Sequence, residues 1–284
     1  MDLQNILTVI EKTDPEVYDR LDTRRSALKN FRNLGGKLAL SAIPLAFGSL
    51  LKKAYAGTNG MQIHGVLNFA LTLEYLEAEF YMKGLENGSI FPAEIRASLQ
   101  TIYNHEKAHV DFLRAAIMSL GETPVEKPTF DFSAGNGSGN GPFKNVFTNA
   151  VTFINVAQTF EDTGVRAYKG QATALMADEY DEVLTAALRI HSVEARHAAH
   201  IRTISRMYNS GTGNVKPWIT LNMSNINSPA VQPSYNGEEL TTQAGINIVG
   251  INGFDISPEA ASEAFDEPLT MEQVLAIVDP FIVP

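Results

Sequence analysis

The sequence predicts an all-α protein, built as an antiparallel four-helix bundle with one long crossover and a mostly irregular C-terminal extension. Two observations carry this prediction. Four long segments place apolar residues at helical spacing. Short turns join the first segment to the second and the third to the fourth, whereas a long Gly-rich stretch separates the two pairs. Short connections make antiparallel neighbours, and the long stretch can cross the bundle.

The four segments span residues 62–84, 92–120, 143–176 and 178–208. Gly88 follows the first segment and marks its stop. Pro92 suits the first turn of the second segment, and Gly121 stands behind its end. The run 135–142, rich in Gly, Asn and Ser, predicts a loop between the two pairs. The fourth segment stops before Gly211.

The last part of the chain differs in composition from the helical segments. Residues 213–284 are rich in Asn, Pro, Ser and Thr, with short apolar runs such as 246–251 and one predicted helix at 271–278. We interpret this part as an extension packed on the bundle rather than a second domain. The bundle domain is therefore predicted to span 57–212.

The first 56 residues have the pattern of an export signal. Arg24 and Arg25 precede an apolar run at 38–51, which is followed by the small-x-small motif Ala54-Tyr55-Ala56. The paired arginines resemble a twin-arginine signal, which implies a periplasmic or otherwise exported protein. An uncleaved amphipathic or membrane anchor is the alternative. The run is shorter than the roughly 20 residues of a spanning helix, so no stable membrane span is expected in the mature chain.

Composition excludes several kinds of site. The chain has no cysteine, which rules out disulfides, iron–sulfur clusters, thiolate zinc sites and cysteine nucleophiles within it. Any metal must therefore be bound by nitrogen and oxygen. The net charge of -10 argues against a nucleic-acid partner, because phosphate contacts need a clustered basic surface.

Two Glu-x-x-His motifs stand in the second and fourth predicted helices. They are Glu106-Lys-Ala-His109 and Glu194-Ala-Arg-His197. Residues three apart share one helical face, so the Glu and the His of each motif can reach the same metal ion. A single such motif is weak evidence, because chance placement produces it often.

The motifs belong to a repeat, which makes them a stronger signal. The first helix offers Glu74 with Tyr81 two turns on, and the third offers Glu161 with Tyr168 at the same spacing. The Glu of the first motif follows Glu74 by 32 residues, and that of the second follows Glu161 by 33. The chain thus contains two copies of one helical hairpin. The candidate metal ligands are Glu74, Glu106, His109, Glu161, Glu194 and His197.

Some neighbouring residues have more than one interpretation. Glu77 lies one turn from Glu74 and could replace or supplement it; we favour Glu74, because only Glu74 repeats the spacing to a tyrosine. Tyr81 and Tyr168 are either plain core aromatics or hydrogen-bond partners of the site. His105, His191 and His200 are predicted to be surface residues or outer neighbours of the ligands, and His64 is predicted to lie near the end of the bundle.

With these motifs, residues 60–208 resemble the ferritin-like superfamily of carboxylate-bridged dimetal proteins. The segment 73–81 is most similar to the bacterial ferritin-like branch that includes desiccation-related proteins. The resemblance implies that Glu106 and Glu194 bridge two metal ions. Glu74 and His109 would complete one metal site, and Glu161 and His197 the other.

The resemblance also implies a function. Two Fe ions, or alternatively Mn, are the expected cofactors, with oxygen or peroxide as reaction partners. The first interpretation is a di-iron oxidase or ferroxidase-type oxidoreductase that oxidises Fe(II) or reacts with oxygen or peroxide. A dimanganese catalase and a non-enzymatic metal-binding or stress- and desiccation-protective bundle are the alternatives. A homo-oligomer is compatible with the sequence, which does not decide the oligomeric state.

Overall fold

A computed structural model describes residues 60–86, 90–176, 180–208 and 215–284. All of these residues belong to one compact part of the chain, Gly48–Pro284. The predicted export signal, 1–56, and the predicted domain boundary at 212 lie outside the described residues. The predicted fold class is confirmed: the described chain is mostly helical, with an irregular C-terminal part.

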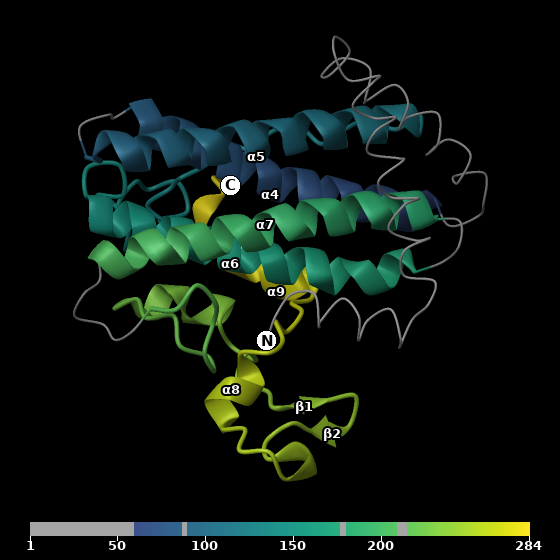
Figure 1. Ribbon diagram of the computed structural model, residues 1–284. Helices are drawn as coiled ribbons and strands as arrows, with labels where there is room; N and C mark the ends of the chain where they lie inside the picture. Colours follow the sequence, from purple (N-terminus) through teal and green to yellow (C-terminus); the bar gives the residue numbers. More distant parts are fainter. Residues whose placement is uncertain (1–59, 87–89, 177–179, 209–214) are drawn as a thin grey trace, which may run out of the picture. The chain divides into compact units, whose positions relative to one another are not determined.

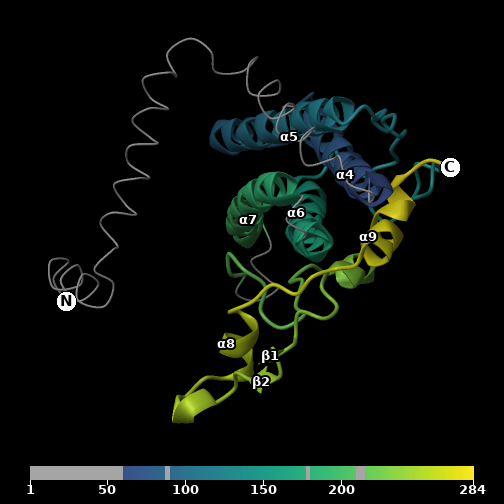
Figure 2. The same cartoon turned by 90° about the vertical axis from the view of Figure 1, so that its right-hand side faces the viewer.

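Four long helices form the bundle: α4 (Gly60–Glu86), α5 (Ala93–Ser119), α6 (Ala150–Ala172) and α7 (Asp181–Tyr208). The most extensive contacts join α4 to α5 and α6 to α7, and smaller contacts join the two hairpins across α4–α6 and α5–α7. The helices run side by side in Figure 1, and Figure 2 views them nearly along their axes, around a common interior. Among the described helices, none combines the length and apolar character needed to cross a bilayer.

The third helix begins at Ala150 rather than at residue 143, which corrects the predicted start. Residues between these positions form turns instead, and the Asn149 side chain accepts a hydrogen bond from Thr152 N at 2.9 Å. An asparagine in this position satisfies a free N–H of the first helical turn, so the cap decides where the helix starts. The other three helices start and end within three residues of their predicted limits.

Aromatic rings fill the half of the bundle where α4 ends and α6 begins. The Phe80 ring stacks on Phe153 with centroids 4.4 Å apart and meets Phe160 edge-on at 5.2 Å. The crossover adds Phe132, 5.6 Å from Phe80, and Phe147, 5.7 Å from it. Offset and edge-on pairs of this kind pack densely and add to the stabilisation from burial.

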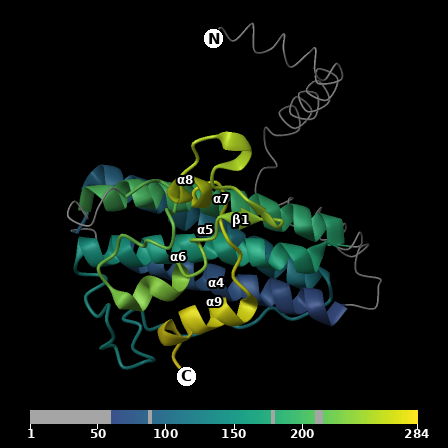
Figure 3. The ribbon, with the colours of Figure 1, turned by 90° about the horizontal axis from the view of Figure 1, so that it is seen from below.

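The C-terminal extension consists of short elements joined by irregular chain. They are the 3₁₀ turn Pro229–Ser234, β1 (Thr242–Gln243), β2 (Ile246–Asn247), the 3₁₀ turn Ile251–Gly253, α8 (Pro258–Ser262), α9 (Met271–Val278) and the 3₁₀ turn Asp279–Phe281. The two strands pair antiparallel. The predicted helix at 271–278 is confirmed as α9, and it lies against α6 (Figure 3).

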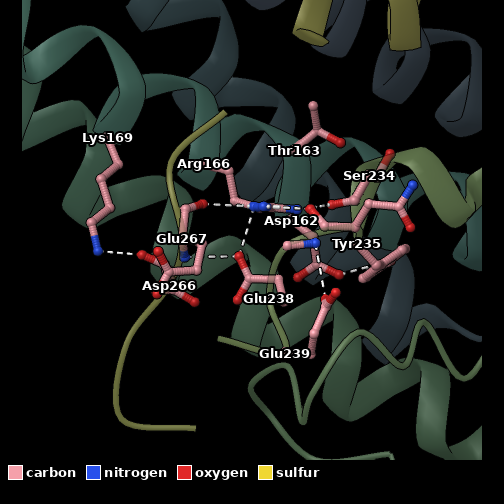
Figure 4. Close-up of polar contacts among 12 residues, drawn as sticks. Asp162, Thr163, Arg166, Lys169, Ser234, Tyr235, Glu238, Glu239, Asp266 and Glu267 are labelled. Atoms are coloured by element: carbon pink, nitrogen blue, oxygen red, sulfur yellow. Dashed lines mark hydrogen bonds and ion pairs between the residues drawn. The ribbon is translucent and has the colours of Figure 1, made fainter. Parts of the chain in front are cut away.

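Buried charges on α6 anchor this extension (Figure 4). Arg166 Nη1 donates to Ser234 O at 2.6 Å, and its Nε donates to Glu267 O at 2.7 Å. Glu238 supplies the counter-charge, with its Oε1 2.6 Å from Arg166 Nε. A guanidinium has five donors in a rigid fork, so one arginine can bind two separate stretches of the extension at once. The extension is thereby tied to the helix that carries Glu161.

Candidate metal centre

The four helices bring all six candidate ligands together in the middle of the bundle. α4 contributes one, α5 two, α6 one and α7 two: Glu74, Glu106, His109, Glu161, Glu194 and His197. The four carboxylates are each at most 1 % exposed, and the His197 and His109 side chains are 5 % and 11 % exposed. Buried carboxylates are costly unless they are paired, protonated or bound to metal.

The six residues form two groups that share two members. Glu74, Glu106, His109 and Glu194 each offer an atom within 4.8 Å of the others, and so do Glu106, Glu161, Glu194 and His197. The shared residues are the glutamates of the two Glu-x-x-His motifs. Each group could hold a metal ion, and the two groups have two carboxylates in common.

The first group converges on one imidazole nitrogen. His109 Nδ1 lies 3.1 Å from each of three carboxylate oxygens, one each from Glu74, Glu106 and Glu194. A ring nitrogen carries at most one proton, so it cannot donate to all three oxygens. The contacts to Glu74 and Glu106 have hydrogen-bond geometry, but one N–H can serve only one of them at full strength, so the three oxygens compete for the same nitrogen.

The second group has close approaches without hydrogen bonds. His197 Nδ1 lies 2.7 Å from Glu106 Oε1 and 3.5 Å from Glu161 Oε2, yet none of these three atoms has a hydrogen-bond partner among the described residues. Both carboxylate oxygens of Glu194 also lack one. Orphaned buried polar atoms require an explanation, and metal binding within the two groups would give them partners. The oxygen and nitrogen donors present therefore fit a metal ion.

The two tyrosines of the repeat reach across the bundle to the site. The Tyr81 hydroxyl on α4 donates to Glu161 on α6, and the Tyr168 hydroxyl on α6 donates to Glu74 on α4. Of the two interpretations left open by the sequence, hydrogen bonding to the site is therefore the one that the geometry shows. Each contact fixes the orientation of a carboxylate that offers its other oxygen to the centre.

Burial and neighbouring charges shift the pKa values of the site strongly. Burial raises the pKa of Glu106 well above its usual range and that of Glu161 to about 7. Burial also pushes the pKa of Glu194 upward, but the two imidazoles outweigh it and lower this pKa to about 2. For His109, burial disfavours the imidazolium, whereas Glu74 and the other carboxylates raise its pKa well above normal. Without metal, some carboxyl groups and the imidazoles of the site therefore retain protons.

Glu77 is a fifth buried carboxyl group beside the centre, although it belongs to neither group of candidate ligands. It is 4 % exposed, and burial followed by the charge of Glu194 raises its pKa well above the usual range. A Cβ placed on Gly164 would lie 3.4 Å from Glu77 Oε1 and 3.7 Å from Glu194 Oε2, so the glycine leaves room for both carboxyl groups. In the sequence, the spacing of three residues between Glu74 and Glu77 was the signal that Glu77 faces inward.

His105 is an outer neighbour of the site. It is exposed, and its Nδ1 lies 2.9 Å from Nε2 of His197, with the two rings stacked at 5.2 Å. His197 thus presents Nδ1 to the carboxylates and Nε2 to His105. An outer partner of this kind holds the ring orientation of a metal-binding histidine.

Comparison with known proteins adds one finding. The sequence model of the family described as "Ferritin-like domain" matches residues 63–207, which is half of the chain and includes all four bundle helices nearly in full. No curated protein and no solved structure matches the chain.

Proposed function

This chain belongs to the ferritin-like domain family, and we propose that it binds two iron ions in the bundle core and reacts them with oxygen or peroxide. The observation that carries the proposal is the convergence of buried carboxylate and imidazole atoms, five of which lack a hydrogen-bond partner among the described residues. Manganese is the alternative metal, because an all-oxygen and imidazole donor set suits both ions.

Each ligand has a role that follows from its group. Glu106 and Glu194 belong to both groups, so they would bridge the ions. Glu74 with His109 would complete one site, and Glu161 with His197 the other. Within each hairpin, the first helix would supply one terminal carboxylate. The Glu-x-x-His motif of the second helix would supply a bridging carboxylate and an imidazole.

Charge balance favours two divalent ions. The four candidate carboxylates carry -4 when ionised, which two divalent cations neutralise. The raised pKa values of Glu106 and Glu161 support this, because they express the cost of keeping those carboxylates charged and buried without a cation.

The residues of the chain hold and shield the ions. Tyr81 and Tyr168 orient Glu161 and Glu74 through their hydroxyls, and His105 holds the ring of His197. Bound Fe(II) would supply electrons to oxygen or peroxide. The near-complete burial of the carboxylates excludes bulk water from that chemistry.

Anaerobic titration with Fe(II), followed by admission of oxygen, tests the proposal. Wild-type protein is expected to take up about two Fe(II) per chain, as two Glu-Glu-His sets imply, and then to consume oxygen and develop a ferric absorbance. Glu106→Ala is expected to abolish both, because it removes a residue shared by the two groups. Glu94→Ala, an exposed glutamate in the first turn of the same helix, is the matched control and should behave as wild type.

Other outcomes would favour the alternatives. Manganese uptake with peroxide disproportionation and no oxygen uptake would move the function to a dimanganese catalase. A metal that raises the melting temperature while oxygen changes nothing would leave a structural, protective bundle. Uptake of one ion or none per chain would defeat both enzymatic interpretations.

The proposed setting is outside the cytoplasm. The paired Arg24 and Arg25 and the Ala54-Tyr55-Ala56 motif support export and cleavage before Gly57. Sequencing the N-terminus of protein from its native host tests this. A chain that begins at Met1 in a cytosolic fraction would contradict it.

A further inference from the structure

An apolar cavity lies inside the bundle next to the candidate metal centre. Three of its lining residues stand one helical turn from a candidate ligand: Ala70 before Glu74, Leu113 after His109 and Ile190 before Glu194. α6 contributes Tyr168, whose ring lines the cavity and whose hydroxyl donates to Glu74. Tyr168 therefore lines the cavity and contacts a candidate ligand at the same time.

The two halves of the bundle differ in how they are filled. On the side of the centre where α4 ends, the rings of Phe80, Phe153 and Phe160 pack against one another. On the opposite side, where α4 and α7 begin, alanines such as Ala116 and Ala186 line the space and leave it partly empty. A core normally packs without voids larger than a water molecule, so a cavity beside the site needs an explanation.

The cavity is suited to a small apolar molecule. Its volume is about 30 Å³, and none of its accessible surface comes from polar atoms of the described residues. One water molecule requires roughly 10–15 Å³ of such space, so the cavity matches a molecule of about two heavy atoms. Water gains no hydrogen bonds in such a place, and apolar cavities stay dry and take up apolar atoms instead. Phe112 on α5, Gln171 on α6 and Ala187 on α7 are the partly exposed lining residues, so the cavity comes closest to the surface at these three helices.

We propose that this cavity binds dioxygen beside the metal centre and is the route by which it arrives. The proposal rests on the proposed oxidative function. A dry site one turn from the ligands would raise the local concentration of an apolar gas while keeping water away from the ions.

Xenon binding to metal-free protein tests the cavity independently of the metal chemistry. Under xenon pressure, NMR signals of the methyl groups of Leu113 and Val183, which line the cavity, are expected to shift and saturate. Ala116→Leu and Ala186→Leu should each abolish this response, because the added side chain fills the space. Ala97→Leu, at an exposed position of α5, is the matched control and should leave it unchanged. Leu113→Ala enlarges the cavity and should bind more xenon, which keeps the test valid if a filled variant does not fold.

The second measurement follows the oxygen reaction of iron-loaded protein. Both filled variants should retain the wild-type iron stoichiometry but react with oxygen at least about tenfold more slowly, because leucine occupies the space that dioxygen needs. The Ala97→Leu control should react at the wild-type rate.

Each contrary result has a distinct meaning. Oxygen consumption without xenon binding would overturn the cavity proposal and leave the proposed function standing. Xenon binding with undiminished oxygen rates in the filled variants would show that dioxygen takes another path. Xenon binding by a wild-type protein that takes up iron but never consumes oxygen would defeat the proposed function, and the dioxygen assignment with it. Tight binding of benzene by wild type would identify a larger hydrocarbon as the ligand and overturn the assignment as well.

Discussion

Replacing Asp162 by alanine is expected to destabilise the protein far more than the same replacement at an exposed position. Asp162 forms a two-pronged ion pair with Arg202, at 2.8 Å to Nε and 2.7 Å to Nη2, and the Arg202 side chain is fully buried. Truncation leaves the guanidinium charge without its partner in the core. Breaking a buried pair from one side costs about 3–5 kcal/mol.

Asp111 is the matched control. Its carboxylate lies 2.7 Å from Lys107 Nζ, but the two side chains are 63 % and 58 % exposed. Solvent screens such a pair, so Asp111→Ala should cost about 0–1 kcal/mol. The two variants differ in burial and not in the chemical change made.

Urea unfolding of metal-free protein, followed by circular dichroism, measures the difference. With a urea dependence of about 2–3 kcal/mol/M, the Asp162→Ala midpoint should fall by about 1.5 M, and the Asp111→Ala midpoint by less than about 0.5 M. The double variant Asp162→Leu with Arg202→Met should recover most of the loss, since it removes both charges. Equal midpoints for the two single variants, or a double variant no more stable than Asp162→Ala, would refute the reasoning.

Three further predictions concern the site and the extension. Glu74→Ala is expected to lower the metal content sharply and Glu77→Ala to leave it largely intact, because only Glu74 belongs to a ligand group. Elemental analysis measures the metal content, and a larger loss in Glu77→Ala than in Glu74→Ala would contradict the assignment. Metal uptake should release protons and weaken as pH falls, because the pKa of Glu161 is raised to about 7 and its proton competes with metal below that pH; a pH-stat trace without proton release would exclude this. Gly170→Ala should loosen the extension, since a Cβ there would lie 1.9 Å from Leu269 O; limited proteolysis should cut the extension faster than in wild type, and unchanged resistance would count against the contact.

The convergence of the candidate ligands was largely predictable, because much of their spacing is local. Each Glu-x-x-His pair shares a helical face at any position in the fold, since residues three apart are always neighbours on a helix. The repeat of the hairpin then placed Glu74 and Glu161 in equivalent positions. The structure brings all six predicted residues together, and the family match covers the helices that carry them.

Other features depended on contacts between distant parts of the chain. The sequence left open what Tyr81 and Tyr168 do, because each hydrogen-bonds a glutamate of the other hairpin, 80 and 94 residues away. Likewise, the role of Arg166 depends on Ser234, Glu238 and Glu267, all of which lie in the extension.

The sequence by itself determined the four helices apart from the start of the third, their pairing into two hairpins, and the stripe of each helix that carries the candidate ligands. Helical periodicity and connection length are properties of neighbouring residues, so they can be derived from the order of residues alone. Only the tertiary structure decided that Glu77 stays outside both groups of candidate ligands and that a small apolar cavity lies on the side of the site opposite the stacked rings. These features depend on the rotation and register of each helix against its neighbours, which the packing of the whole core sets at once.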